Sequence, residues 1–337
     1  MKVSLQHSDP IGRRELLRLT VAGAAALAAG SRAARAQGEK VHIRLGHLPI
    51  TDHLTVIAAS RAQFEKLTLE PVKFASWPEL AEALKAGSLE AAFALTPISL
   101  TLRQKGAPIK IVLLGHRNGS VLLAANDIAK VGDLRGKTIA IPSRFSTHNL
   151  LLRRLLSREG IDADRDVTLV ELPPPEMVQS LARGGISAFI VAEPFGAQAE
   201  LRKLGKVLAL SKDIWPNHVC CALNAREDLI AAHPEAVQEL VTALTAAGHF
   251  ATEHPQEAAQ LSKRYLGQDP AVVLRAMTEP PGRVTYDDLV PTLADLSATQ
   301  DDMIKYKLAS APVDLSRFLD DRFARAAQSP GGKRSAR

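Results

Sequence analysis

The chain has 337 residues, of which 46% are hydrophobic and 23% charged, and its formal net charge is +6 at pH 7. This length exceeds what one ordinary hydrophobic core needs, so we expect two lobes. Only two cysteines are present, which excludes a disulfide scaffold. The sequence has no basic stripe with interleaved aromatic residues, the pattern that would indicate nucleic-acid binding.

The first 36 residues have the order of an export signal. Arg13 and Arg14 form a twin-arginine pair, an Ala/Gly-rich run follows over 20–30, and Ala34-Arg35-Ala36 fits a cleavage site. The run is shorter than the roughly 20 apolar residues of a transmembrane helix. We therefore expect export to the periplasm by the twin-arginine route with cleavage after Ala36, against the alternative of a frayed helix with chance arginines. Cleavage would remove six basic and two acidic residues and lower the net charge from +6 to +2.

From residue 41 onward, short apolar runs alternate with helical patterns, which indicates βα units and mostly parallel sheets. Strands are expected over 41–45, 69–76, 91–95, 109–114, 121–125, 138–141, 167–172, 188–192, 207–210 and 219–223. Helices are expected between them over 53–67, 79–86, 98–104, 147–158 and 175–184, and in a segment that ends at Gly205. After residue 223 only helices are expected, over 227–231, 234–253, 255–265, 271–277, 287–307 and 315–327, with Pro234 and Pro255 at first helical positions.

A wholly helical third block has no sheet of its own, so we expect it to pack on the first block. This gives a discontinuous lobe one over 37–128 and 224–328, a continuous lobe two over 129–223, and a basic flexible tail over 329–337. The two chain crossings near 127–131 and 212–226 are expected to form a hinge that closes the lobes around a ligand.

Several short segments are distinctive in their order and spacing. They are Gly-His-Leu-Pro-Ile-Thr-Asp over 46–52, Ala-Leu-Thr-Pro over 94–97, Phe-Ser-Thr-His-Asn over 145–149, Pro-Pro-Pro-Glu-Met-Val over 173–178, Ala-Glu-Pro-Phe over 192–195 and Val-Asp-Leu-Ser-Arg-Phe over 313–318. Together they resemble the nitrate/sulfonate/bicarbonate-type periplasmic binding proteins of ABC importers, and most of all the nitrate and bicarbonate branch.

The resemblance implies an α/β chain with the type II periplasmic-binding-protein fold and a ligand cleft between the lobes. It also implies a small polar or anionic ligand such as nitrate, bicarbonate or a sulfonate. The expected partners are that small molecule and an ABC permease and ATPase complex, and we expect a monomer with no cofactor. A periplasmic ligand sensor of the same fold, and a binder of a neutral solute such as a pyrimidine precursor, remain as alternatives.

An enzyme on this fold is the remaining alternative, and the sequence does not favour it. The patterns G-x-S-x-G, H-E-x-x-H, G-x-x-x-x-G-K-S/T and G-x-G-x-x-G do not occur. The ten histidines are scattered, so we expect no metal cluster. The adjacent Cys220 and Cys221 are interpreted as small apolar residues of a buried strand, with a metal or redox role as the alternative.

Open α/β sheets bind ligands beyond the carboxyl ends of their strands, which selects several polar loops here. The strongest is Ser146-Thr147-His148, at the start of the helix over 147–158. Unpaired N–H groups and the helix dipole favour an anion there. Ser146 is a natural cap, and the resemblance implies that His148 contacts the oxyanion. The alternative is a capped helix with a surface histidine.

The other candidate ligand groups are less specific. Thr51 and Asp52 can serve as helix caps or face the cleft, and Trp77 can form a pocket wall or simply pack. Thr96 and His116 follow strands and are weaker candidates, while Glu193 is expected to orient neighbouring backbone or hinge groups.

The resemblance places a charged residue of that branch, Lys in nitrate binders and Glu in bicarbonate binders, near Asn217. The neutral Asn217 and His218 in its place indicate a ligand held by neutral donors, or a neutral solute.

Overall fold

The computed structural model describes residues 39–51 and 53–328. The described residues from Val41 onward belong to one compact unit. The expected export signal over 1–36, the candidate residue Asp52 and the expected tail over 329–337 lie outside the described residues. Within the described part, no helix combines the length and the apolar composition that crossing a membrane requires.

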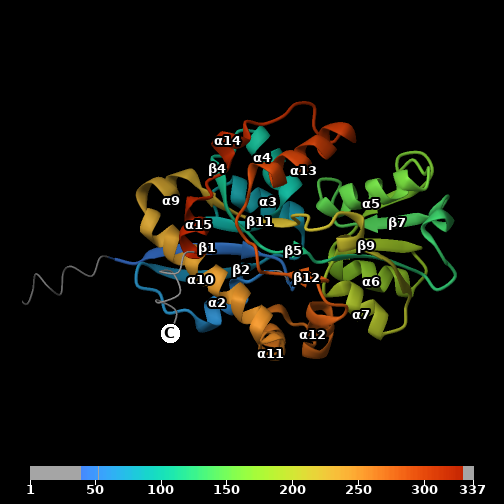
Figure 1. Cartoon of the computed structure of the whole chain (residues 1–337), viewed down its shortest axis with the longest axis horizontal. Coiled ribbons are helices and arrows are strands. Elements are labelled where there is room, and N and C mark those ends of the chain that lie inside the picture. Colours follow the sequence, from blue (N-terminus) through green and yellow to red (C-terminus); the bar gives the residue numbers. More distant parts are fainter. Residues whose placement is uncertain (1–38, 52, 329–337) are drawn as a thin grey trace, which may run out of the picture. The chain divides into compact units, whose positions relative to one another are not determined.

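A first five-stranded sheet combines four strands that precede residue 115 with one strand, β11, that follows the second sheet in the chain (Figure 1). Its order is β2 (Leu67–Lys73), β1 (Val41–His47), β3 (Ala91–Leu95), β11 (Cys221–Arg226) and β4 (Ile109–Leu114). β1 runs parallel to β2 and β3, whereas β11 runs antiparallel to β3 and β4. The chain therefore leaves this sheet after β4 and returns to its interior in β11.

The intervening segment forms a second five-stranded sheet. Its order is β10 (Lys206–Leu210), β6 (Ser120–Ala124), β9 (Ala188–Ala192), β7 (Thr138–Ile141) and β8 (Thr168–Glu171). β6 pairs antiparallel with β9 and β10, so it belongs to this sheet although the expected lobe boundary at 128 assigns it to lobe one. An apolar run reveals a strand but not its partners, which explains the difference.

The helices occupy the segments between and after these strands. They are α2 (Thr55–Arg61), α3 (Trp77–Lys85), α4 (Thr96–Gln104), η1 (Val131–Leu134), α5 (Thr147–Arg158), α6 (Pro174–Ala182), α7 (Phe195–Leu201), α8 (Ser211–Ile214), α9 (Glu227–Ala232), α10 (Pro234–Glu253), α11 (Pro255–Leu266), α12 (Pro270–Thr278), α13 (Leu293–Lys305), α14 (Leu315–Phe318) and α15 (Arg322–Gln328). Two short strands, β5 (Arg117–Asn118) and β12 (Val284–Thr285), pair with each other.

Two C-terminal helices differ from their predicted extents, and local hydrogen bonds explain both differences. The helix predicted over 287–307 begins only at Leu293, because Thr292 and Asp295 form a reciprocal capping box at its start. The helix predicted over 315–327 is split into α14 and α15, and Asp320 between them donates its backbone N–H to the Ile111 carbonyl at 2.9 Å.

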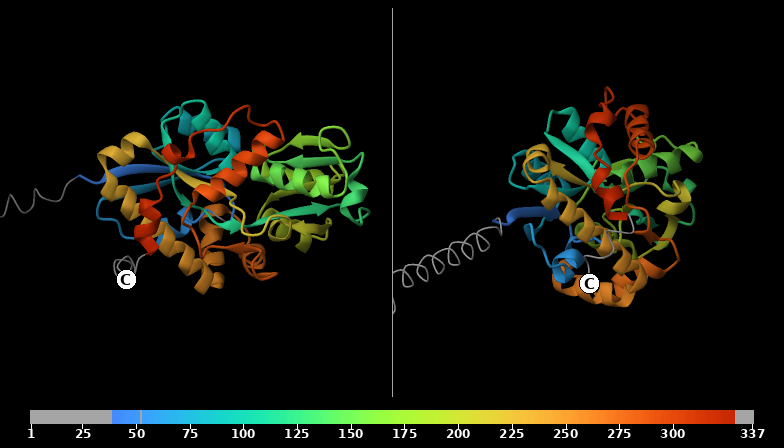
Figure 2. Two further views of the ribbon diagram at one scale, coloured as in Figure 1. Left: turned by 45° about the horizontal axis from the view of Figure 1, so that its top comes forward. Right: turned by 60° about the vertical axis from the view of Figure 1, so that its left-hand side comes forward.

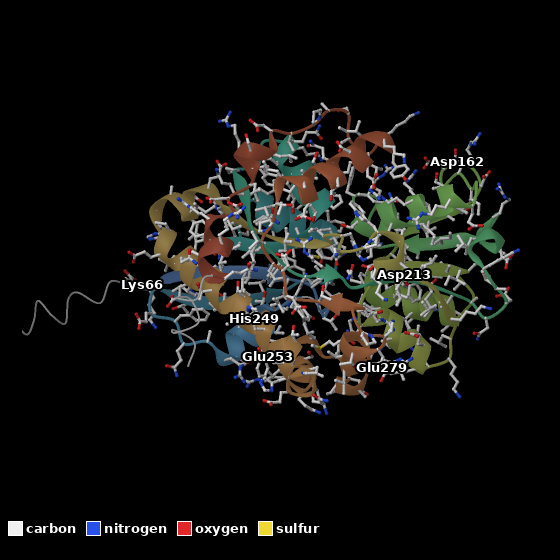
Figure 3. The ribbon with its side chains drawn as sticks, viewed as in Figure 1. Lys66, Asp162, Asp213, His249, Glu253 and Glu279 are labelled. Carbon is white, nitrogen blue, oxygen red and sulfur yellow. The ribbon has the colours of Figure 1, made fainter. Side chains whose placement is uncertain are left out.

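The helices that follow β11 contact both parts of the unit (Figures 1 and 2). α10 packs against α2 and α15, on the side of the first sheet, whereas α12 packs against α7 and α13 against α5. One apolar cluster runs through both halves, from Leu45 and Phe93 to Val121 and Phe189. Charged side chains such as Lys66, Asp213 and Glu253 are exposed (Figure 3).

Candidate functional site

The carbonyl group of Cys220 is the point where three distant segments meet. Thr96 donates both its backbone N–H, at 2.9 Å, and its hydroxyl, at 3.1 Å, to this carbonyl oxygen. Thr147, at the start of α5, donates its hydroxyl to the same oxygen at 3.2 Å. The two predicted site residues Thr96 and Thr147 therefore connect the residue that precedes β11 to the end of β3 and to the start of α5.

The start of α5 is built by Ser146. Its hydroxyl oxygen accepts a hydrogen bond from the backbone N–H of Asn149 at 3.1 Å and donates to the Ser143 carbonyl at 2.6 Å. Ser146 is therefore the N-cap that the sequence predicts, and it is fully buried. The cap fixes the direction in which the next turn presents Thr147 and His148.

His148 is fully buried rather than lying on the surface. Its Nε2 lies 3.1 Å from the Ser120 hydroxyl, at the start of β6, and 4.0 Å from the Cys220 sulfur. Its Nδ1 is buried without a hydrogen-bond partner. The alternative of a surface histidine is excluded. The imidazole faces Cys220, which directly precedes β11 of the first sheet.

His116, Cys220 and Cys221 form a buried cluster at this junction. One donor atom of each lies within 4.8 Å of the others, and neither cysteine is in a disulfide. Both cysteines are buried, as predicted, and the fold brings His116 to them, whereas the sequence led us to expect no metal cluster among the scattered histidines. Sequence spacing missed it because the loop after β4, the start of β11 and the start of α5 meet only in the fold. The signal that was available is the rule that places ligand groups at strand ends.

The environment perturbs two titratable groups at this junction, His218 and Cys220. Burial lowers the pKa of His218 to about 4, assisted by neighbouring His116 and His148, so His218 is neutral at pH 7. Burial alone would raise the pKa of the Cys220 thiol. Hydrogen bonds from Cys221, His116 and His148 together with the charge on His148 outweigh burial and hold that pKa well below its ordinary value. Cysteine sulfurs beside imidazole nitrogens are a donor set that suits a soft metal ion.

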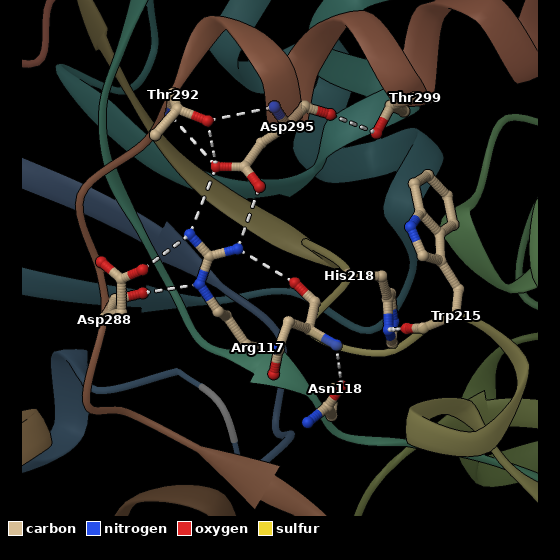
Figure 4. Close-up of polar contacts among 9 residues, drawn as sticks. Arg117, Asn118, Trp215, His218, Asp288, Thr292, Asp295 and Thr299 are labelled. Carbon is tan, nitrogen blue, oxygen red and sulfur yellow. Dashed lines mark hydrogen bonds and ion pairs between the residues drawn. The ribbon is translucent and has the colours of Figure 1, made fainter.

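His218 is oriented by its own backbone neighbourhood. Its Nδ1 lies 3.1 Å from the Trp215 carbonyl oxygen, which can only accept, so Nδ1 carries the proton (Figure 4). The lone pair is then on Nε2, which is buried and has no hydrogen-bond partner.

Asn217, the other candidate in this crossing, is exposed and lies in a left-handed turn with φ of 58°. The structure therefore separates Asn217 from the buried cluster that His218 borders.

The chain passes from the first sheet to the second through residues 115–119, between β4 and β6, and Arg117 in this crossing contacts the second crossing (Figure 4). Its guanidinium donates to the Asn217 carbonyl at 2.9 Å and to both carboxylate oxygens of Asp295 at 3.0 and 3.2 Å. It also donates to the Asp288 carbonyl at 2.9 Å. Asn118 accepts the backbone N–H of Asn217 at 3.0 Å through its side-chain oxygen. The crossings thus lie side by side and are tied to the start of α13.

A second link between the two sheets runs through Thr51 and Glu193. Thr51 donates its N–H, at 3.0 Å, and its hydroxyl, at 3.1 Å, to the Glu193 carbonyl. The Glu193 carboxylate is fully buried and accepts from Arg283 Nε at 2.6 Å and from the Ala197 N–H at 3.0 Å. Burial raises the pKa of Glu193, and Arg283 opposes that rise. Glu193 therefore contacts neighbouring backbone groups, as its predicted orienting role requires: its carbonyl accepts from Thr51 and its carboxylate from the Ala197 N–H.

The predicted residues therefore divide into three sets. Those brought together around Cys220 are Thr96, His116, Thr147, His148 and His218, with Ser146 directly behind them. Thr51 and Glu193 form the separate link just described. Trp77 lies in the core at 1% exposure against the ring of His53, and Asn217 is exposed. The most informative residues that the sequence did not select are Cys220, Cys221 and Ser120.

Two sheets joined by two crossings, with polar groups gathered where strands of both sheets end, define an α/β chain of the type II periplasmic-binding-protein fold. The model of the NMT1-like family matches residues 36–266, and the chain belongs to that family. The expected fold and family resemblance are thereby confirmed.

Three relatives illustrate the similarity. The chain is 34% identical over 244 residues to the nitrate import ATP-binding protein NrtC of Synechocystis, which covers 65% of this chain and 36% of that protein. The ligand-binding component of an ABC-type import system from Staphylococcus aureus, solved with zinc bound, matches at 28% identity with a TM-score of 0.78, covering 86% of this chain and 99% of that one. The periplasmic nitrate-binding protein NrtA of Synechocystis shares the fold at 19% identity with a TM-score of 0.79, covering 86% and 88%. The matches span 36% to 57% of the length of the first three curated relatives.

Proposed function

We propose that this chain is the exported solute-binding component of an ABC importer and that it binds a small solute between its two sheets. The observation that carries the proposal is the convergence of Thr96, Thr147 and His148 on Cys220, from segments that belong to different sheets. Polar groups that converge from strand ends are where open α/β folds place ligands. The names of the relatives, which include import and binding proteins, agree with this role.

The proposal includes two lobes that close around the solute. The sequence predicts a lobe one of 37–128 and 224–328 and a lobe two of 129–223. Strand pairing favours moving the first crossing to 115–119, because β6 belongs to the sheet of lobe two. The second crossing lies over 211–220, before β11. Asn118 and Asn217 both have positive φ, at 61° and 58°, and such turns suit a hinge that two paired crossings form.

The ligand chemistry of the proposed site differs from that of a simple anion pocket. His218 is neutral at pH 7, and the guanidinium of Arg117 is already paired with Asp295 and Asp288. A nitrate-, bicarbonate- or sulfonate-like anion would therefore be held by neutral donors. In this role the chain follows the twin-arginine route to the periplasm, is cleaved after Ala36, acts as a monomer without catalysis, and delivers the solute to a permease and its ATPase.

The test of solute binding is a thermal-shift and calorimetric screen of the purified protein. The panel contains nitrate, nitrite, bicarbonate, sulfonates, pyrimidines and divalent metal ions. We expect one class to bind with a dissociation constant near micromolar, which corresponds to about −8 kcal/mol. His148→Ala should weaken that binding at least tenfold, while His42→Ala, which removes an exposed histidine, should not change it. No response to any panel member, or turnover of one, would contradict the proposal.

The test of transport uses a strain that lacks the chain. We expect uptake of the solute found in the screen to fall, and to return when the wild-type chain is supplied but not when His148→Ala is supplied. Normal uptake in the deletion strain would remove the importer role and leave only a periplasmic binder or sensor.

A further inference from the structure

We propose that the junction around Cys220 is a binding site for a thiophilic metal ion such as Zn²⁺, coordinated by the sulfurs of Cys220 and Cys221 and by the imidazoles of His116 and His148. That such an ion is the solute delivered to the importer rests on the proposed function, whereas the coordination itself does not. The proposal narrows the solute from a small polar molecule to a metal cation.

The spacing of the donor atoms fits one ion. In a tetrahedral zinc site the Zn–S distance is about 2.3 Å and the Zn–N distance about 2.0–2.1 Å, which places the donor atoms roughly 3.5–3.8 Å apart. Here the donor atoms of His116, Cys220 and Cys221 lie within 4.8 Å of one another, and His148 Nε2 lies 4.0 Å from the Cys220 sulfur. Contraction by about 1 Å, through side-chain rotation, brings the donors of His116, Cys220 and Cys221 onto one centre, and His148 Nε2 is the neighbouring nitrogen that can complete the set.

A buried nitrogen atom gives a second, independent indication of a ligand. His218 Nε2 is buried without a hydrogen-bond partner, which an apolar side chain at that position would avoid. His218 has the arrangement of a metal-site histidine, since its Nδ1–H is bound by a backbone carbonyl and its Nε2 lone pair is left available. It borders the same group and is available as a replacement fourth ligand.

The position of His116 depends on a glycine. Gly119 has φ of +82°, and a Cβ added there would lie 2.7 Å from His116 Nδ1. A side chain at 119 would therefore displace the imidazole from the cysteines. The backbone of the loop after β4 therefore leaves space for the imidazole of His116. Packing of the two small cysteine side chains alone would not require this space.

The donor types at the junction favour a soft cation over an anion. Cysteine sulfurs are at most weak hydrogen-bond donors, so the two cysteines are a poor lining for nitrate or bicarbonate. Soft thiolate and imidazole donors select zinc and copper(I) rather than magnesium or calcium, which prefer oxygen ligands.

The ligand set would also couple metal binding to the junction of the two sheets. His148 is on α5 with the second sheet, the cysteines enter β11 of the first sheet, and His116 lies in the crossing between them. An ion shared by these segments would fasten one sheet to the other.

The first test uses the wild-type protein alone, reduced, freed of metal with a chelator and shown by thiol titration to hold two thiols. Zn²⁺ is titrated in competition with a chromophoric chelator, and Co²⁺ is used as a spectroscopic substitute. We expect one equivalent of metal, with a thiolate-to-cobalt charge-transfer band and the strong visible absorption of a tetrahedral site. Mg²⁺ and Ca²⁺ should not compete.

The second test assigns the ligands. Cys220→Ser and Cys221→Ser should each weaken zinc binding at least about 100-fold, more than the 10–100-fold typical of an outer-shell partner, and should abolish the charge-transfer intensity of one thiolate. His148→Gln should weaken binding while keeping the charge-transfer band. His42→Gln, at an exposed histidine, is the matched control and should leave binding unchanged.

Failure of the wild-type protein to bind Zn²⁺, Co²⁺ or copper(I) with both thiols reduced would overturn the metal site, whether or not any variant folds. Unchanged binding in both cysteine variants would do the same. The proposed function fails separately. If metal binds but the deletion strain takes up zinc normally, the site stands and the importer role does not, whereas binding of a panel solute without metal removes the site and leaves solute binding.

Discussion

Arg117 is expected to be the strongest single fastening between the two crossings, and Arg117→Met tests this. The substitution keeps the unbranched apolar part of the side chain and removes the charge and all the donors. It breaks the hydrogen bonds to Asp295 and leaves the carbonyls of Asn217 and Asp288 without their guanidinium partner. The perturbation is therefore local and electrostatic.

The magnitude follows from burial. The Arg117 side chain is 9% exposed and that of Asp295 18% exposed, whereas Asp288 is 63% exposed and contributes little. Removing one partner of a buried pair costs about 3–5 kcal/mol. Asp295 keeps hydrogen bonds from the Thr292 hydroxyl, at 2.7 Å, and the Thr292 N–H, at 3.1 Å. We therefore expect a loss near the lower end, about 3 kcal/mol of unfolding free energy.

The loss should also depend on pH in a defined direction. Burial would raise the pKa of Asp295, but hydrogen bonds and charge from Arg117 together with Thr292 hold it below its ordinary value. A depressed folded-state pKa contributes stability that is present above the unfolded value, near 3.9, and is lost as pH falls through the folded value. The difference between wild type and Arg117→Met should thus be full at pH 7 and narrow below about pH 4.

Urea unfolding followed by circular dichroism, at pH 7 and at steps toward pH 3.5, measures both quantities. The matched control is Arg165→Met, which removes a partner of Asp162 from a pair that is 78% and 39% exposed and should leave stability unchanged. A loss below about 1 kcal/mol at pH 7, or a difference that stays constant into acid, would refute the assigned role of the pair.

Three further substitutions test other contacts by the same unfolding assay. Glu193→Gln should cost about 3 kcal/mol of unfolding free energy, because the Arg283 side chain is 2% exposed and loses its fully buried charged partner. Glu200→Gln, which changes the 18% exposed partner of Arg283, should cost less. The reverse order would contradict this ranking. Gly205→Ala should cost about 2 kcal/mol or more, since its Cβ would lie 2.2 Å from the Ala124 carbonyl oxygen, whereas Gly132→Ala, with no atom nearer than 3.9 Å, should be neutral. Thr147→Val should cost only about 1 kcal/mol, because Thr96 still satisfies the Cys220 carbonyl, and a loss above about 3 kcal/mol would show that Thr147 does more than this.

Local signals in the sequence predicted most elements well. The helix over 147–158 is found at those residues, because Ser146 provides the cap and Gly160 follows its end. α10 and α11 start at Pro234 and Pro255, as predicted. The late start of α13 was also readable, since Thr292 and Asp295 have the spacing of a capping box. What local signals did not supply was the sheet in which β6 pairs, because partners are chosen by the whole fold.

The candidate site was predictable in its polar loops and not in its chemistry. The rule of strand ends selected His116 and His148, the family resemblance selected His218, and the fold brings all three to one junction. The cysteines were interpreted by their immediate neighbours, as small buried residues, and they are buried. Their relation to His148, which lies 72 residues away in the chain, depends on how β11 re-enters the first sheet. Metal-site motifs are defined by ligands at short, fixed sequence spacings. They therefore do not detect candidate ligands that are distant in the chain and meet only in the fold.

The three links between the two sheets differ in what a solute would change. The Arg117 link and the Thr51–Glu193 link are made of protein groups that already satisfy one another, so they persist with or without a solute. The junction at Cys220 is the one of these three that contains buried nitrogen atoms without partners, on His148 and His218. Of these three links, only this junction offers a bound ion a buried nitrogen lone pair without a partner, on His218 Nε2. In the proposed site, binding therefore stabilises closure at the junction and leaves the other two links as a fixed hinge.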